Sequence, residues 1–308
     1  MGELMMAQED PVPHRGRVPT QWHGKPTMLR MALGGRLRRL REASQVTRDA
    51  AGDVIRGSSS KISRMELGRV SFKERDVADL LTLYGVTDEQ QREAFLALAR
   101  QANAPGWWRK YGDVLPSWFE TYVGLEQAAS VIRIYEPVLV PGLLQTEDYT
   151  RAVMQLRHVQ AGADDVERRV ALRMTRQQFL TRPEAPDLWV ALDEAAARRP
   201  VGSETVRRAQ LQHLIEMAQR PNITLQIVPW HVGGPATVGG PFTILRFAEP
   251  GVPDVVYLEH LGSACYLDKE RDTVEYLALM DGLCVEAKSV DASIRFLRRI
   301  IEDLPGNP

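Results

Sequence analysis

Apolar positions recur with the period of a helix five times between residues 27 and 103. Each pattern is short and is followed by polar residues or glycine, which predicts a small, all-helical domain. The five patterns are the face of Leu33, Leu37 and Leu40, the segment from Thr47 to Ile55, the segment that follows Ser58-Ser59-Ser60 and stops at Gly68, the segment from about Lys73 to Tyr84 with Gly85 after it, and a segment that starts at Thr87 with Phe95, Leu98, Ala99 and Ala102 as its buried stripe.

Residues with known roles at helix ends mark several of these boundaries. Thr47 is a favourable N-cap, because its hydroxyl accepts a hydrogen bond from an early N–H group. Gly68 fits the position just after a helix, where a left-handed backbone is common. Thr87 and Gln90 have the spacing of a capping box, which predicts that the fifth helix starts at Thr87.

The pattern changes after Pro105-Gly106, the clearest boundary in the chain. Longer helices now alternate with short strands, which predicts an α+β domain. The glycine-rich segment His231–Gly240 joins two strands, so we expect them to pair with a long loop in a small, largely antiparallel sheet. The predicted helices are 118–128, 147–158, 164–181, 203–219, 270–287 and 290–303, and the predicted strands are Val131–Tyr135, Leu188–Leu192, Ile223–Val228, Phe242–Phe247 and Val255–Leu258.

The domain organisation follows from these patterns. Residues 1–26 contain four prolines and no apolar periodicity, which favours a disordered arm. The rest divides into a mainly α domain at 27–103 and a larger α+β domain at 104–308. A chain of 308 residues is long enough to give each domain a core of its own.

The composition excludes several classes of protein. With 44% hydrophobic and 26% charged residues, the chain is typical of a globular protein. No apolar run is long enough to span a bilayer, and the N-terminus lacks the order of a signal peptide. The two cysteines, Cys265 and Cys284, cannot form a disulfide framework, so we expect a cytoplasmic location and no membrane partner.

The formal net charge of −1 conceals a basic segment. Between residues 30 and 69 the basic side chains outnumber the acidic ones, so the remainder of the chain is acidic. A small basic module joined to a larger acidic one is typical of a protein that binds a polyanion and has a second task. The basic residues are Arg30, Arg36, Arg38, Arg39, Arg41, Arg48, Arg56, Lys61, Arg64 and Arg69, and the acidic ones are Glu42, Asp49, Asp53 and Glu66.

The segment from Thr47 to Leu67 has the layout of a helix-turn-helix motif. Ala51 and Gly52 are small enough for two helices to cross closely, and Ile55 and Ile62 fit their common core. The second helix carries short polar and basic side chains near its N-terminus, where a recognition helix enters the major groove of DNA. A solvated basic bundle that binds another protein is the alternative. The polar residues in question are Ser59, Ser60, Lys61, Ser63 and Arg64.

The strings LGGRLRRLREASQVT and SSSKISRMELGR resemble the Xre family of transcriptional regulators, which have five-helix, phage-repressor-like helix-turn-helix domains. The resemblance implies that Arg48 contacts a phosphate and that Ser59 and Ser60 open the recognition helix. It also implies that the loop after this helix grips the DNA backbone. The DNA-binding residues that it implies are Arg48, Ser58, Ser59, Ser60, Lys61, Ser63, Arg64, Arg69 and Lys73.

The sequence departs from that family at two places. The usual glutamine is missing at Arg48 and at Ser59, and Arg56 replaces the usual turn glycine, with Gly57 one residue later. Serine discriminates between bases less well than a bidentate arginine or glutamine does. The sequence therefore does not predict the operator.

The second domain resembles the long C-terminal domain of WhiJ-like, antitoxin-like actinomycete regulators. The strings VPGLLQTEDYTRA, LDEAAARRPVG, QLQHLIEMAQRPNITLQIVPW and VVYLE carry the resemblance, which extends over nearly all of Ala104 to Leu304. It implies that this domain binds a partner, such as a small companion protein encoded nearby. It implies no catalytic activity.

Three groups of residues in the second domain are candidates for binding. An aromatic group after residue 106 is interpreted as an interdomain core, with a pocket or interface as the alternative. Acids and bases at 193–199 are interpreted as a helix start, with a partner contact as the alternative. A basic helix face is interpreted as solvated, with DNA contact as the alternative. The aromatic group is Trp107, Trp108, Tyr111, Trp118, Phe119 and Tyr122. The charged group at 193–199 is Asp193, Glu194, Arg198 and Arg199, and the basic helix face is Arg168, Arg169, Arg173 and Arg176.

The sequence contains no motif for catalysis, metal binding or nucleotide binding, and its six histidines are scattered. We therefore expect no enzyme activity, no cofactor and no metal. The leading hypothesis is a sequence-specific DNA-binding transcriptional regulator, a homodimer because one such domain covers a half-site, whose second domain binds a partner protein or a small effector. The alternative is an antitoxin-like protein that mainly binds a small companion protein and binds DNA for autoregulation.

Overall fold

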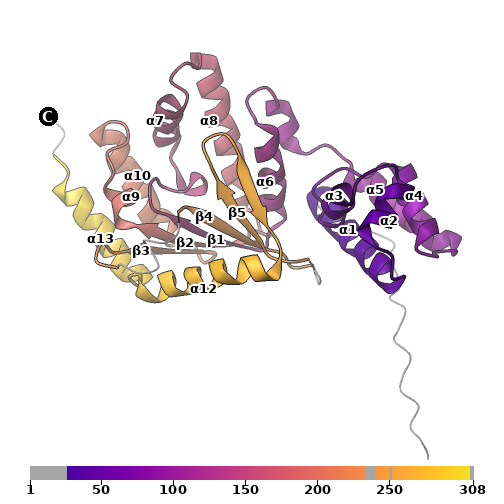
Figure 1. Cartoon of the computed structure of the whole chain (residues 1–308). Coiled ribbons are helices and arrows are strands. Elements are labelled where there is room, and N and C mark those ends of the chain that lie inside the picture. Colours follow the sequence, from indigo (N-terminus) through magenta and orange to yellow (C-terminus); the bar gives the residue numbers. More distant parts are fainter. Residues whose placement is uncertain (1–25, 233–239, 250–251, 306–308) are drawn as a thin grey trace, which may run out of the picture.

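A computed structural model describes residues 26–232, 240–249 and 252–305. It has two parts, an N-terminal bundle of short helices in indigo and purple and a larger domain in which helices cover a sheet (Figure 1). The arm expected at 1–26 lies outside the described residues, except for Pro26. Within the described segments, no helix is long and apolar enough to cross a membrane.

Five helices form the N-terminal bundle, as the apolar pattern predicts. They share one core, in which Leu33, Leu37, Ile62, Phe72 and Leu81 are almost fully inaccessible to solvent. The predicted stripe of the fifth helix is buried as expected. The helices are α1 (Pro26–Ala43), α2 (Arg48–Val54), α3 (Ser59–Glu66), α4 (Glu74–Leu83) and α5 (Glu89–Ala102).

The N-caps of α2 and α5 test two of the predicted helix starts. The hydroxyl of Thr47 accepts a hydrogen bond from the Ala50 N–H at 3.1 Å, which confirms the predicted cap of α2. The capping box predicted from Thr87 is wrong. Asp88 caps α5 instead, accepting a hydrogen bond from the Gln90 N–H at 3.1 Å. A carboxylate is the better cap, because it also interacts favourably with the positive end of the helix dipole.

A close approach of two backbones fixes α3 against α1. A Cβ atom at Gly34 would lie 2.4 Å from the carbonyl oxygen of Met65 and 2.5 Å from that of Glu66. Gly68 follows α3 with a φ of +65°, the left-handed conformation that favours glycine after a helix. The lack of a side chain at Gly34 therefore decides how closely α3 packs on the bundle.

The larger domain contains every helix and strand that the pattern predicts, with bounds that differ by a few residues. The short strand β6 and three 3₁₀ helices were not predicted, whereas α9 matches the helix start predicted at 193–199. The elements are η1 (Trp107–Tyr111), α6 (Ser117–Ala128), β1 (Val131–Glu136), η2 (Gly142–Leu144), α7 (Glu147–Arg157), α8 (Ala163–Gln177), η3 (Gln178–Thr181), β2 (Asp187–Asp193), α9 (Glu194–Arg198), α10 (Glu204–Met217), β3 (Ile223–Val228), β4 (Phe242–Arg246), β5 (Val255–Glu259), β6 (Ala264–Leu267), α12 (Glu270–Glu286) and α13 (Val290–Asp303).

The strands form one six-stranded mixed sheet in the order β3-β2-β1-β4-β5-β6. Strands β1, β2 and β3 run parallel, and the pairs β1–β4, β4–β5 and β5–β6 are antiparallel. The expectation of a largely antiparallel sheet is therefore wrong for the β1–β2–β3 half. The expected pairing of β3 with β4 is also wrong, because β2 and β1 lie between them. Helices return the chain to the same end of the sheet after β1 and after β2, which makes these strands parallel.

Helices cover both faces of this sheet (Figure 1). Ile132 and Ile134 of β1 point into the larger core, which α6, α7, α10 and α13 complete. Tyr135, the next residue, points into a smaller core under α12. The alternation along each strand thus places α6, α7 and α8 on one side, where the cavity described below is found.

Two arginines of α8 turn inward, which corrects the interpretation of this helix as a solvated basic face. Arg176 is 5% exposed and donates hydrogen bonds from Nε at 3.0 Å and Nη2 at 2.7 Å to the fully buried carboxylate of Glu126 on α6. Arg173 is half-buried, with its Nε atom inaccessible to solvent, and its Nη1 atom donates to Gln145 at 2.6 Å. Arg169 is half-buried and donates to the Val114 carbonyl oxygen at 2.7 Å, whereas Arg168 fits the interpretation, since it pairs with Asp113 at the surface.

Helix α1 contacts the larger domain as well as its own bundle. Met31 lies in the main core of the larger domain together with Leu125 of α6. Thr27 approaches α6 so closely that a Cβ atom at Gly124 would lie 2.5 Å from its Oγ1 atom. Helix α1 therefore contributes to both cores.

Replacing Glu126 with alanine should lower the free energy of unfolding by about 3–5 kcal/mol, because it leaves the Arg176 guanidinium buried without its partner. Urea denaturation measures this change. Glu167→Ala is the control, because Glu167 pairs with Arg151 at the surface and its loss should cost about 1 kcal/mol or less. Losses of the same small size in both variants would contradict the importance of the buried pair.

Candidate nucleic-acid interface

Helix α3 buries one face and presents the other to solvent. Ile62 and Met65 are each 1% exposed in the core of the bundle. On the opposite face Ser60 and Arg64 are exposed, one helical turn apart. Ser59 and Ser63 lie half-buried beside them. A solvent-facing helix with short polar side chains and an arginine is suited to the major groove of DNA.

The predicted DNA-binding residues Ser58 and Lys61 have structural partners in α3 and α4. Ser58 is the N-cap of α3, and its hydroxyl accepts a hydrogen bond from the Lys61 N–H at 3.2 Å. The ammonium group of Lys61 lies 2.6 Å from Asp76 of α4, which ties the two helices together. Lys61 is therefore held at the side of α3, toward α4, while Arg64 extends into solvent.

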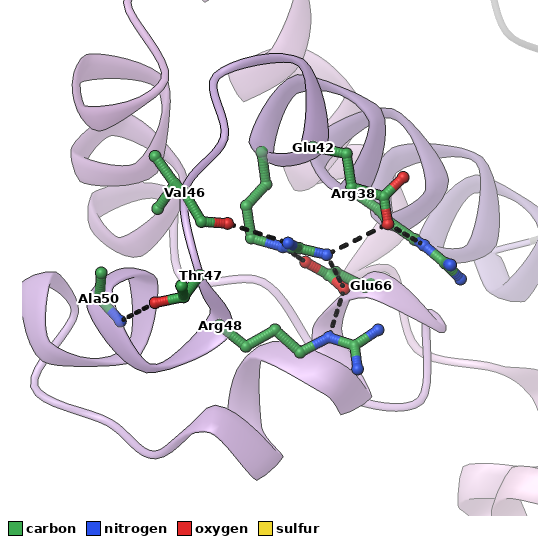
Figure 2. Close-up of polar contacts among 8 residues, drawn as sticks. Arg38, Glu42, Val46, Thr47, Arg48, Ala50 and Glu66 are labelled. Carbon is green, nitrogen blue, oxygen red and sulfur yellow. Dashed lines mark hydrogen bonds and ion pairs between the residues drawn. The ribbon is translucent and has the colours of Figure 1, made fainter.

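Glu66 holds the end of α3 to α1 and α2 (Figure 2). Its buried carboxylate accepts hydrogen bonds from Arg41 Nε at 2.5 Å and from Arg48 Nε at 3.0 Å. The hydrogen bond with Glu66 raises the pKa of Arg41 above its ordinary value, so Arg41 stays charged. Arg41 also donates to the Val46 carbonyl oxygen at 3.0 Å. This network fixes the position of the recognition helix.

The bond to Glu66 orients Arg48 without using all of its donors. Among the described residues, only its Nε atom makes a hydrogen bond, so both terminal nitrogens remain available. Arg48 lies in the first turn of α2, where its side chain is partly exposed. The resemblance to the Xre family implies a phosphate contact at this residue, and its orientation is compatible with one.

Arg56 was not among the residues expected to bind DNA. It lies in the turn between α2 and α3 with a φ of +51°, and its side chain is exposed. This is the place of the usual turn glycine, so Arg56 keeps the left-handed conformation at an energetic cost. The replacement of that glycine by an arginine is a sequence signal that points to this residue.

Arg69 and Lys73 flank the loop after α3. Lys73 is exposed just before α4. Arg69 instead reaches the larger domain, where its Nη2 atom lies 2.5 Å from a carboxylate oxygen of Asp268, just before α12. Its guanidinium carbon lies 5.4 Å from the ring centroid of Tyr266 on β6. We call this set of Arg69, Tyr266 and Asp268 the Arg69 contact.

The aromatic candidates of the larger domain do not gather at one site. Trp108 and Tyr111 are buried in a small core between η1, α6 and α8, and Trp107 packs edge-on against Trp108 at 6.0 Å between ring centroids. Trp118 is half-buried on α6 and lines a cavity. The first three residues therefore have a packing role.

The charged candidates at 193–199 form a helix start, as the favoured interpretation predicts. Asp193 caps α9 by accepting a hydrogen bond from the Ala195 N–H at 2.7 Å. Glu194 pairs with Arg198 one turn later at 2.7 Å. Arg199 donates to the carbonyl oxygen of Val138 at 2.9 Å. These contacts explain all four side chains without a ligand.

Comparison with known families agrees with this division of the chain. Residues 32–95 match a model described as a helix-turn-helix domain, so the N-terminal bundle is of this class. Residues 119–299 match the model described as a domain of unknown function, DUF5753. This match covers more than half of the chain, and the protein belongs to that family. Neither a curated protein nor a solved structure matches the chain.

Replacing Arg56 with glycine should raise the free energy of unfolding by about 1 kcal/mol, because glycine adopts the left-handed conformation without a Cβ clash. Thermal denaturation measures the effect. Gln45→Gly is the matched control, because Gln45 has a φ of +54° and is also exposed. Both variants should gain stability, and only Arg56→Gly should also weaken DNA binding. A less stable Arg56→Gly protein would contradict the strain at this turn.

Proposed function

We propose that the protein is a cytoplasmic, non-enzymatic DNA-binding transcriptional regulator of the Xre type. The exposed polar face of α3 is the observation that carries this proposal. Ser60 and Arg64 project from it, and Arg48 and Arg56 flank it, Arg48 with both terminal nitrogens free among the described residues. Base edges would face Ser59, Ser60, Ser63 and Arg64, and phosphates would face the flanking arginines.

The regulator would act as a homodimer on an operator with two half-sites. One recognition helix reads only a few base pairs, so a second copy one helical turn away along the DNA supplies the remaining specificity. Phosphate contacts would contribute much of the affinity, and added salt would therefore weaken binding steeply. The dimer itself stays a prediction.

Arg64→Ala should weaken binding to the operator by about 1–3 kcal/mol if Arg64 contacts a base, and it should weaken binding to a shuffled duplex much less. Fluorescence anisotropy of a labelled duplex from upstream of the protein's own gene, over a salt series, measures both affinities.

Arg298→Ala is the matched control, because Arg298 is an exposed arginine on α13 of the larger domain. It should leave both affinities nearly unchanged. Equal losses of affinity for both duplexes in Arg64→Ala would show that Arg64 contacts a phosphate and not a base. Wild-type protein that does not distinguish the duplexes would count against sequence-specific regulation.

The larger domain would control DNA binding through the Arg69 contact. Arg69 lies in the loop that grips the DNA backbone in proteins of the Xre type, yet its charge is neutralised here by Asp268. A phosphate and the Asp268 carboxylate would thus compete for one guanidinium group. An effector or partner that moves β6 or the start of α12 would shift this competition.

Asp268→Asn should strengthen DNA binding by about 3- to 10-fold, because it removes the charge that competes for Arg69. The same anisotropy assay measures the gain. Asp272→Asn, an acid one turn further along in α12, is the control and should give no gain. The double variant Arg69→Ala/Asp268→Asn should also lose the gain, and an unchanged affinity in Asp268→Asn would contradict this route of control.

A small companion protein remains the alternative partner of the larger domain, as the resemblance to WhiJ-like regulators implies. Co-purification with the product of the adjacent gene tests this alternative. If the wild-type protein binds the native and shuffled duplexes equally weakly but co-purifies with the companion protein, the antitoxin-like function becomes the favoured hypothesis.

A further inference from the structure

A cavity of about 540 Å³ lies in the larger domain between the sheet and helices α6, α7 and α8. Its polar lining includes Glu136, Arg157, Arg173, Arg176, Tyr257 and Glu259. Cavities of this size typically hold small molecules, which they orient through a few polar groups.

A smaller chamber of about 180 Å³ opens from the same place. It is mainly apolar, with Val114, Leu115, Trp118 and Leu172 in its walls. The chamber and the cavity share a row of lining residues that includes Phe119 and the arginines of the cavity. Together they offer a charged region that continues into an apolar one.

The charges of the cavity balance except at one residue. Arg176 is neutralised by Glu126, and Arg157 pairs with Glu259 at 2.7 Å. Arg173 has no carboxylate within ion-pair distance among the described residues. Its Nη1 atom donates to the neutral amide oxygen of Gln145 at 2.6 Å, and its Nε atom is buried without a partner.

Glu259 and Glu136 both line the cavity with Arg173, but Glu259 pairs with Arg157 and Glu136 makes no ion pair with Arg173. Burial, together with the charge of Glu259, raises the pKa of Glu136 to about 8, so its carboxyl is mostly protonated. Burial and neighbouring Arg176 lower the pKa of Arg173 to about 10, which leaves its guanidinium charged. An uncompensated buried cation is costly to the protein and attractive to an anion.

We infer that this cavity binds a small organic monoanion, a carboxylate attached to an apolar group, with the carboxylate on Arg173 and the apolar group in the chamber beside Trp118. A carboxylate can accept two hydrogen bonds from the guanidinium group of Arg173, the one arginine shared by the cavity and the chamber that has no ion-pair partner among the described residues. The apolar walls of the chamber favour a hydrocarbon or aromatic group over a second charge. The inference gives the effector of the proposed regulator a chemical class and rests on that proposed function.

The position of the cavity connects it to the Arg69 contact. Glu259 ends β5, and Leu261 lies in the turn to β6; both line the cavity. Strand β6 carries Tyr266, whose hydroxyl donates to the Trp118 carbonyl oxygen at 2.6 Å and whose ring packs on Arg69. A ligand beside Trp118 and Glu259 thus borders the hairpin that holds Arg69.

The test uses the full-length protein without DNA and a panel of probes with different charges. Isothermal titration calorimetry and thermal shift compare octanoate and phenylacetate with their neutral amides and with phenyl phosphate. The two carboxylates should raise the melting temperature and bind at least about 10-fold more tightly than the amides. Equal binding of acids and amides, tighter binding of the phosphate, or no binding of any carboxylate would overturn the inference.

Arg173→Gln should weaken carboxylate binding about 10- to 100-fold, because it removes a charge-assisted hydrogen bond. Arg168→Gln, on the exposed side of the same helix, is the control and should leave binding unchanged. Both variants should keep the circular dichroism spectrum of the folded wild-type protein. Unchanged affinity in Arg173→Gln would overturn the inference.

DNA binding is measured separately, without any carboxylate, so the two proposals can fail independently. Carboxylate binding without operator binding would keep the site and reject the regulator. Operator binding without carboxylate binding would keep the regulator and reject the site.

Discussion

The ion pair of Glu126 and Arg176 is the interaction on which the larger domain depends. It joins α6 to α8 with Glu126 fully buried and Arg176 5% exposed, and each charge requires the other. Helix α6 packs against α1 of the bundle, and α8 forms a wall of the cavity. A single buried pair thus links the surface that supports the helix-turn-helix domain to the site that we assign to a ligand.

Most helices and strands could be predicted from the sequence, but the arrangement of the sheet could not. Apolar alternation identified Ile223–Val228 as a strand because the period of two is local. The partner of each strand is not local, and the nearest strand in the sequence, β4, was the wrong choice. The predicted helices between the first three strands were the better guide, since a strand that follows a helical crossover usually runs parallel to the one before it. Strand β6 has four residues, too few for its pattern to be distinguished from a loop.

The candidate DNA-binding residues show a similar limit. The spacing and charge of the segment placed Ser60 and Arg64 on an exposed helix face, as the structure has them. Charge alone could not show that Lys61 and Arg69 have carboxylate partners, because Asp76 and Asp268 lie far from them in the sequence. The inward turn of Arg173 and Arg176 on α8 could not be predicted for the same reason. The charged side chains can be counted in the sequence, but the tertiary fold determines which of them have an ion-pair partner.

Helix α1 has a consequence for how the chain folds. Its 18 residues form a rod about 27 Å long that supplies Leu33 and Leu37 to one core and Met31 to the other. Neither core is complete without it, so the two halves share a folding unit even though their sequences separate cleanly near Pro105. Unfolding of the whole chain should therefore be one cooperative transition, and a fragment that starts after the bundle would begin with its own core exposed to water.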